Sequence, residues 1–144
     1  MVNAIILGIA QKIRTVFNEG EYGLYTENVE QGFNEPCFFV QLTSHTQKQR
    51  LANRYKETYC FEVIYYTSED GNKNQECLTV AEGLDELLEY INADGDLLRG
   101  KNFSSKITDG ILHFYVEYNM FVLREQEPEV NMEEVIVYEK TIKW

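Results

Sequence analysis

Few residues in this chain have a type and spacing suited to acid–base or nucleophilic catalysis. The two histidines, His45 and His113, are the side chains that titrate near neutral pH without a perturbed environment. His113 lies in an alternating pattern typical of a strand, where a structural role is expected, and His45 lies in a polar segment without a cysteine or carboxylate partner nearby in sequence. The chain contains no nucleophile elbow, P-loop, H-E-x-x-H or G-x-G-x-x-G motif. We therefore expect no catalytic residue and no small-molecule substrate.

One short segment begins like a calcium-binding loop. Asp94, Gly95 and Asp96 match the start of such a loop, but Leu98 and Gly100 occupy positions that should supply oxygen ligands. Because these two residues have no side-chain oxygen, we reject a calcium site. The sequence predicts neither a metal nor a cofactor.

A cluster of basic residues stands out against the acidic background of the chain. Lys48, Arg50, Arg54 and Lys56 place four of the 13 basic residues in nine positions, whereas the formal net charge of the whole chain is −11. A charged loop in solvent would account for this cluster. The functional alternative is a docking arm that contacts an acidic surface, for example on a second copy of the chain or at a tube end. A contact with nucleic acid is the third option, and the overall negative charge disfavours it.

Two strands must carry this basic segment. Cys37 to Leu42 and Thr58 to Tyr66 are rich in aromatic and β-branched residues, and Pro36 suits the first position of a strand. The residues between them, Ser44 to Lys56, are too many for a tight turn, so they form either a projecting arm or an extension of both strands. Alternation gives each strand one apolar face, namely Phe38, Val40 and Leu42 on the first and Tyr59, Phe61, Val63 and Tyr65 on the second.

Two amphipathic helices are predicted on either side of this strand pair. Apolar residues recur at spacings of three and four over residues 2 to 17, which predicts a helix that ends before Asn18. A second apolar face begins at Cys77 and continues to Ile91, and Asp94-Gly95 is expected to end this helix. The opposite face of the second helix is acidic, with Glu76, Glu82, Asp85, Glu86 and Glu89.

Further strands are expected elsewhere. Tyr22 to Thr26 is compatible with a short strand, and Leu112 to Val122 alternates strictly between apolar and polar residues. Asp109-Gly110 is a strong signal for a two-residue hairpin turn between a segment from Lys101 to Thr108 and this last strand.

The predicted fold class is therefore α+β, with two helices packed on one face of a mostly antiparallel sheet and the order α-β-β-(β)-α-β-β. Residues 1–144 should form a single domain. Residues 125–144, which begin with several glutamates and continue as Val135-Ile136-Val137-Tyr138, are expected to be a C-terminal extension or a last strand.

Composition and cysteine content indicate where the protein folds. A hydrophobic content of 44% with 10 tyrosines is typical of a folded globular protein. The three cysteines, Cys37, Cys60 and Cys77, lack metal-ligand or CxxC spacing, so we expect buried free thiols in a reducing compartment. We find no signal peptide and no apolar run of about 20 residues, the length that a membrane helix needs. The expectation is a protein made and folded in a cytoplasm, with no membrane partner.

The segment from Val29 to Val40 reads Val-Glu-Gln-Gly-Phe-Asn-Glu-Pro-Cys-Phe-Phe-Val. Together with the N-terminal helix and the basic Gln-Lys-Gln-Arg segment followed by Asn53-Arg54-Tyr55, it resembles the tail terminator family of phage and phage-like contractile particles from Gram-positive bacteria. The resemblance covers most of the chain and the order of its elements. It implies a small α+β protein without catalytic residues, in which Gly32, Glu35 and Pro36 shape the entry to the central strands.

The resemblance also implies a function. Members of this family form a ring, usually of six subunits, that caps the finished tail tube, stops its polymerisation and provides the surface that joins the head or closes the particle. The expected partners are thus further copies of the chain, the tail tube and sheath or head-completion proteins. The expected location is the bacterial host cytoplasm during assembly and then the tail of the virion or phage-like particle. Two alternatives remain: another head-to-tail joining or minor tail protein, and a small cytosolic enzyme whose site is assembled from scattered carboxylates and tyrosines.

Overall fold

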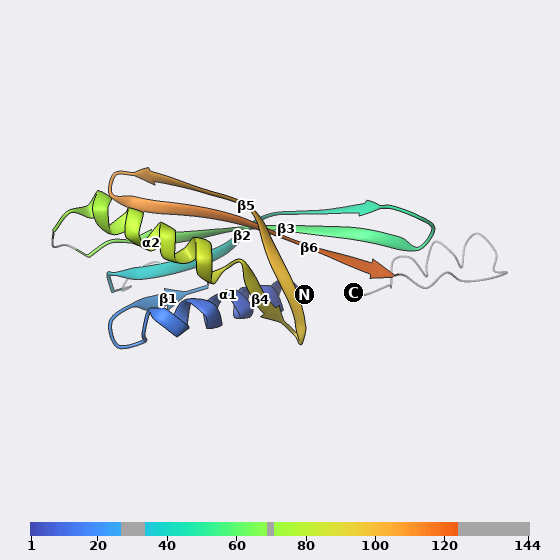
Figure 1. The fold of residues 1–144 in the computed structure, drawn as a ribbon, viewed down its shortest axis with the longest axis horizontal. Helices are drawn as coiled ribbons and strands as arrows, with labels where there is room; N and C mark the ends of the chain where they lie inside the picture. Colours follow the sequence, from blue (N-terminus) through green and yellow to red (C-terminus); the bar gives the residue numbers. More distant parts are fainter. Residues whose placement is uncertain (27–33, 69–70, 124–144) are drawn as a thin grey trace.

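The computed structural model describes residues 1–26, 34–68 and 71–123 as two helices on one face of a six-stranded sheet (Figure 1). This α+β architecture confirms the predicted fold class. The order of elements is α1 (Val2–Val16), β1 (Gly23–Tyr25), β2 (Cys37–Gln49), β3 (Arg54–Tyr66), α2 (Lys73–Leu87), β4 (Tyr90–Ala93), β5 (Asp96–Thr108) and β6 (Ile111–Leu123).

The sheet has the strand order β1-β2-β3-β6-β5-β4. All neighbouring strands are antiparallel except the short β1, which pairs in parallel with the first three residues of β2. The connection from β3 to β6 contains α2 and the β4–β5 hairpin, so the β3–β6 pairing joins residues far apart in the sequence, from Tyr66 opposite Ile111 to Arg54 opposite Leu123. The predicted short strand at Tyr22 to Thr26 is therefore present as β1.

The core lies between the helices and one face of the sheet. The alternation predicted for β3 is confirmed, because Tyr59, Phe61, Val63 and Tyr65 are all buried while Cys60, Ile64 and Tyr66 on the other face are only half-buried. On β2, the predicted face holds Phe38 and Val40, both buried, and the half-buried Leu42. Helix α1 contributes Ile5, Ile9 and Ile13, and α2 contributes Cys77, Val80, Ala81 and Leu84.

Helix α1 also packs closely against the edge strand β4. Gly8 is buried, and an ideal Cβ built on it would lie 2.3 Å from the backbone oxygen of Asn92. Only a residue without a side chain allows the two backbones to come this close. The helix predicted for residues 2 to 17 is thus confirmed, and its partner strand is one that the sequence pattern did not reveal.

The end of α2 differs from the prediction. The helix ends at Leu87, and Ile91 belongs to β4 instead of continuing the apolar face of the helix. Ile91 is nevertheless fully buried, because the strand brings it to the same core. Asp94-Gly95 is the turn of the β4–β5 hairpin and not a helix end, since both residues have positive φ angles, 55° and 90°.

Asp109-Gly110 forms the second hairpin turn, between β5 and β6, as predicted. Its φ angles are 52° and 74°, the same left-handed combination as at Asp94-Gly95. Strand β5 is longer than the segment expected from Lys101, because its first residues pair with β4 before the strand changes partner near Gly100. A register shift within the β5–β6 pairing, between Lys101 and Ser104, follows shortly after this change.

The three cysteines are free thiols within regular elements, Cys37 in β2, Cys60 in β3 and Cys77 in α2. Cys37 and Cys77 are buried, as expected, whereas Cys60 is half-buried on the open face of the sheet. Burial, and then the charge of Glu35, raises the pKa of the Cys37 thiol to about 11. The predicted C-terminal extension or last strand at 125–144 lies outside the described residues. In the described part, neither helix has the length and apolar content needed to cross a membrane.

Candidate functional site

The basic segment of the sequence is built into a projecting end of the sheet. Strand β2 continues to Gln49 and β3 begins at Arg54, so the segment extends both strands and closes in a short turn. Residues 119–123 of β6 pair with 54–58 of β3, which adds a third strand. In Figure 1 these three strand ends extend to the right, beyond both helices. We call residues 43–58 and 119–123 the arm. The segment is therefore both a projecting arm and an extension of the two strands, the two alternatives that the sequence left open.

A β-bulge at Thr43 changes which side chains face the helices. Before the bulge Leu42 is opposite Phe61, and after it His45 is opposite Tyr59, so the core side of β2 changes from even to odd residues. His45, which has no carboxylate partner nearby in sequence, therefore gains one from the neighbouring strand. Its Nε2 lies 2.6 Å from Oε1 of Glu57, and its ring stacks on Tyr59 with centroids 4.5 Å apart.

Glu57 is fully buried, and its second oxygen, Oε2, has no hydrogen-bond partner among the residues that the structure describes. Burial of a carboxylate is costly unless it is paired, so the contact with His45 is what makes Glu57 tolerable at this position. The pair fixes the point where the arm leaves the core.

The four predicted basic residues lie together on the arm. Lys48 is directly opposite Lys56 across the strand pair, and the backbone N–H of Arg50 donates to the carbonyl of Arg54 at 2.8 Å. Like charges in directly opposite positions destabilise a strand pair. None of the four forms an ion pair within residues 1–26, 34–68 and 71–123. The arm thus holds a concentration of positive charge that the described part of the chain does not neutralise.

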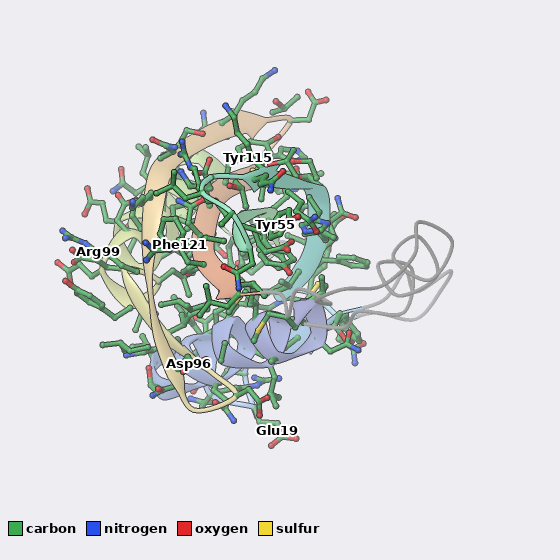
Figure 2. All side chains as sticks on the ribbon, turned by 90° about the vertical axis from the view of Figure 1, so that its right-hand side faces the viewer. Glu19, Tyr55, Asp96, Arg99, Tyr115 and Phe121 are labelled. Carbon is green, nitrogen blue, oxygen red and sulfur yellow. The ribbon has the colours of Figure 1, made fainter. Side chains whose placement is uncertain are left out.

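Apolar side chains accompany these charges at the end of the arm. Leu51, Phe121 and Leu123 are 73%, 56% and 72% exposed, and the guanidinium of Arg54 lies 5.1 Å from the ring centroid of Phe121. With residues 52 and 53 they surround a hollow of about 590 Å³. Figure 2 views the sheet from this end, with Tyr55 and Phe121 labelled. Exposed leucine and aromatic side chains next to arginine are typical of interaction surfaces. The sequence indicates the charges of this surface but not its apolar part.

The open face of the sheet carries a hydrogen-bonded cluster around Glu62. His113 Nδ1 lies 2.7 Å from one carboxylate oxygen, and Gln41 donates to the other at 2.8 Å. Burial alone would raise the pKa of Glu62, but hydrogen bonds from His113, Gln41 and Tyr115 outweigh it, so the pKa lies below its ordinary value. The structural role expected for His113 agrees with this contact.

The three motif residues fall at the entry to β2. Gly32 lies outside the described residues. Glu35 is exposed, and the Glu35-Pro36 peptide bond is cis. The carbonyl of Pro36 accepts a hydrogen bond from the backbone N–H of Gly23 at 3.0 Å, which ties the motif to β1. That Gly32 and Glu35 shape the entry to the central strands remains a prediction. Pro36 bonds to the short strand β1 and also lines the pocket described next.

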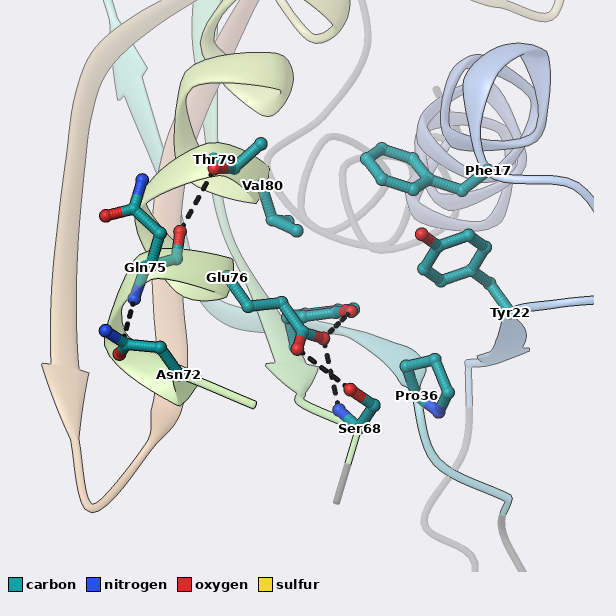
Figure 3. A pocket seen from close by; sticks show the side chains of 10 residues that line it. Phe17, Tyr22, Pro36, Ser68, Asn72, Gln75, Glu76, Thr79 and Val80 are labelled. Carbon is teal, nitrogen blue, oxygen red and sulfur yellow. Dashed lines mark hydrogen bonds between the residues drawn. The ribbon is translucent and has the colours of Figure 1, made fainter. Parts of the chain in front are cut away.

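A pocket of about 500 Å³ lies at the end of the molecule opposite the arm, between the start of α2 and the end of α1 (Figure 3). Three of its ten lining residues are aromatic, and one carboxylate, that of Glu76, faces it. Glu76 accepts hydrogen bonds from the hydroxyl of Tyr65, the backbone N–H of Ser68 and the hydroxyl of Ser68. The lining residues are Phe17, Tyr22, Pro36, Tyr65, Ser68, Asn72, Gln75, Glu76, Thr79 and Val80.

The pocket has a single carboxylate, whereas the enzyme alternative would require a clustered pair with strongly raised pKa values in a deep pocket. In the described ranges, no group of three histidine, cysteine, aspartate or glutamate side chains is arranged to hold a metal ion. What the geometry provides is two different contact surfaces, one at each end of the molecule.

A comparison with protein-family models identifies one match. The model described as "Phage tail terminator protein" matches residues 4–130, which is most of the chain. No curated protein matches the chain. Among the solved structures that match, one is similar at 11% sequence identity over 90% of this chain and 99% of the other, with a TM-score of 0.38.

Proposed function

Because this chain belongs to the phage tail terminator family, we propose that it forms a ring that caps the tail tube of a phage or phage-like particle. The family is one of structural proteins, and membership makes the chain a structural component of a phage tail. In the proposed function the ring, of six subunits as is usual in the family, ends polymerisation of the tube. Its outer surface then joins the head or closes the particle. Assembly would take place in the bacterial host cytoplasm.

The observation that carries the proposal is the arm. A closed ring of identical subunits related by rotation needs two different, complementary surfaces on each subunit. The arm supplies a positive surface with Lys48, Arg50, Arg54 and Lys56, and it projects away from the helices where a neighbouring subunit or a tube end can reach it (Figure 1).

An acidic surface on α2 is available as a counterpart. Glu82, Asp85 and Glu86 are exposed near the C-terminal end of the helix, whose last turn has no basic residue. Negative charges at this end oppose the helix dipole. Partial burial, and then the charge of Glu82, raises the pKa of Asp85. This end of the helix would be stabilised by positive charge from another subunit.

The energy of such a contact is small for each subunit but repeated around the ring. An exposed ion pair contributes about 0 to 1 kcal/mol. In a ring the same contact occurs at every interface, so removal of one pair per interface weakens the whole assembly. Because these charges are exposed, assembly should also weaken as the salt concentration rises through the range in which the Debye length falls below about 10 Å.

The test is reversal of charge on the arm. Lys48→Glu with Arg50→Glu should leave the fold unchanged by circular dichroism, because both side chains are exposed, yet should abolish rings in electron micrographs and leave tubes uncapped and overlong. The matched control is Lys101→Glu with Lys106→Glu, two exposed lysines on β5 whose reversal changes the net charge by the same amount.

Two outcomes would contradict the proposal. Normal rings and normal tube length with the arm variant would mean that the arm is a solvated extension of the sheet. An absence of rings with the unmodified protein, together with its recovery at the head-to-tail junction of the particle, would instead favour another joining protein.

A further inference from the structure

The pocket at the start of α2 has both a negative charge and apolar walls. Phe17, Tyr22 and Tyr65 supply aromatic surface, and Phe17 packs edge-on against Tyr22 at a centroid distance of 5.0 Å. Glu76 is half-buried beside Tyr65, on the wall opposite Phe17 and Tyr22 (Figure 3). A carboxylate beside aromatic rings suits a cationic group that carries an apolar stem or neighbour. The chemistry of the pocket therefore favours a basic and apolar partner over an anionic one.

Glu76 retains capacity for one more strong donor. Its Oε2 accepts from the hydroxyl of Tyr65 and the backbone N–H of Ser68, whereas, among the described residues, its Oε1 accepts from the hydroxyl of Ser68 alone. A carboxylate has about four lone-pair sites. In the part of the chain that the structure describes, no cation forms an ion pair with Glu76. A guanidinium N–H from outside the subunit would complete its hydrogen bonding.

The turn at the arm tip matches these requirements. Arg50 and Leu51 are adjacent and both exposed, Leu51 to 73%. The backbone bonds from Arg50 N–H to Arg54 C=O and from Arg54 N–H to Leu51 C=O hold this turn in place, at 2.8 and 2.7 Å. The turn therefore presents a cation and an apolar side chain together, on a pre-formed support.

We propose that the arm-tip turn of one copy docks in the pocket of the next copy, with Leu51 against the aromatic walls and Arg50 on Glu76. This inference rests on the proposed ring and identifies the acceptor surface within it. The arm tip and the pocket lie at opposite ends of the long axis (Figure 1). The contact therefore joins unlike surfaces and can continue from subunit to subunit until a ring closes.

The experiment uses one variant on each side of the contact. Thr79→Trp fills the pocket from an exposed helical position, and Arg50→Glu with Leu51→Ser removes both groups at the tip. Each should raise the protein concentration needed for ring formation by about tenfold or more, as loss of a central interface contact does. Thr15→Trp is the matched control, since Thr15 is also an exposed helical threonine but does not line the pocket.

Mixing the two defective proteins gives the decisive measurement. The pocket variant keeps a normal arm and the arm variant keeps a normal pocket, so an equimolar mixture should form dimers, measured by analytical ultracentrifugation, but no closed rings. If Thr79→Trp forms rings at the wild-type concentration while the arm variant does not, the arm binds elsewhere, for example on the acidic surface of α2. That result overturns this inference and leaves the proposed function standing. If the wild-type protein forms no rings, the proposed function itself fails.

Discussion

The same glycine-to-alanine substitution should have opposite effects in the two helices. Gly8 in α1 and Gly83 in α2 both have helical backbone, so alanine at either position gains about 0.8 to 1 kcal/mol of intrinsic helix propensity. What differs is the space next to them. A Cβ on Gly83 would meet only the tip of the Phe17 ring, at 3.8 Å, whereas a Cβ on Gly8 would lie 2.3 Å from the backbone oxygen of Asn92.

The clash at Gly8 sets the size of the effect. To bring that contact from 2.3 Å to an ordinary distance of about 3.4 Å, α1 must move by about 1 Å away from β4. Ile5 and Ile9, both fully buried, would lose part of their packing as the helix moves. Overpacking of this kind costs about 1 to 3 kcal/mol and sometimes more. Because the clash is with a backbone oxygen, which cannot rotate away as the end of a side chain can, we take the upper part of this range, about 2 to 3 kcal/mol. After the propensity gain is subtracted, we expect Gly8→Ala to destabilise the protein by about 1 to 2 kcal/mol and Gly83→Ala to stabilise it by up to about 1 kcal/mol.

Thermal unfolding followed by circular dichroism measures both effects. For a domain of this size 1 kcal/mol corresponds to about 4 °C, so Tm should fall by about 4 to 8 °C for Gly8→Ala and rise by up to about 4 °C for Gly83→Ala. A Gly8→Ala protein as stable as the wild type would refute the close packing of α1 on β4. A large decrease in Tm with Gly83→Ala would show that the space next to Gly83 is not open.

Two further predictions concern the sheet. Phe61→Ala removes a fully buried ring beside Tyr118 and should lower the free energy of unfolding by about 3 to 5 kcal/mol. Phe121→Ala, at a 56% exposed position, should lower it by less than about 1 kcal/mol. Equal losses of stability in urea denaturation would mean that the strand faces are assigned incorrectly. Because the pKa of Glu62 is lowered in the folded state, its contribution to stability should be present above its ordinary value of 4.5 and decline as the pH falls below it. His113→Ala should make this decline shallower, and an unchanged pH profile would contradict the role given to that contact.

The central strands could be predicted because their two faces have different environments. Phe61 and Val63 point to the core and Glu62 to the open face, so apolar and polar residues alternate along this part of β3. The arm segments of the same strands have solvent on both sides at residues such as Lys48 and Gln49, and no apolar alternation is required there. For this reason the sequence from Ser44 to Lys56 is compatible with both a loop and a strand.

The β4–β5 hairpin was missed for a different reason. Ile91 fits both the helical spacing from Leu84 and Leu88 and the alternation of a strand, and local sequence does not distinguish the two. The choice is made by tertiary packing, since β4 fills the space beside α1 and pairs with β5. The turn Asp94-Gly95 was the available signal, since the identical dipeptide at 109–110 was correctly predicted as a hairpin.

For the candidate site, composition identified the charges but not their surroundings. The clustering of Lys48 and Arg50 is visible in the sequence, whereas the apolar contribution of Phe121 depends on the pairing of β6 with β3 across more than 60 residues. The pocket likewise combines side chains from the segment that follows α1, from β3 and from α2, which only the fold brings together. No local motif marks it.

The packing of α1 on β4 also sets an order of events during synthesis. The helix is complete at Val16, but the strand on which Gly8 rests begins at Tyr90, about 75 residues later. At translation rates of about 5 to 20 residues per second, roughly 4 to 15 seconds separate the two. Throughout that interval Ile5, Ile9 and Ile13 have no finished core to cover them. During this time the apolar side chains of the first segment stay without the strand that covers them in the folded protein.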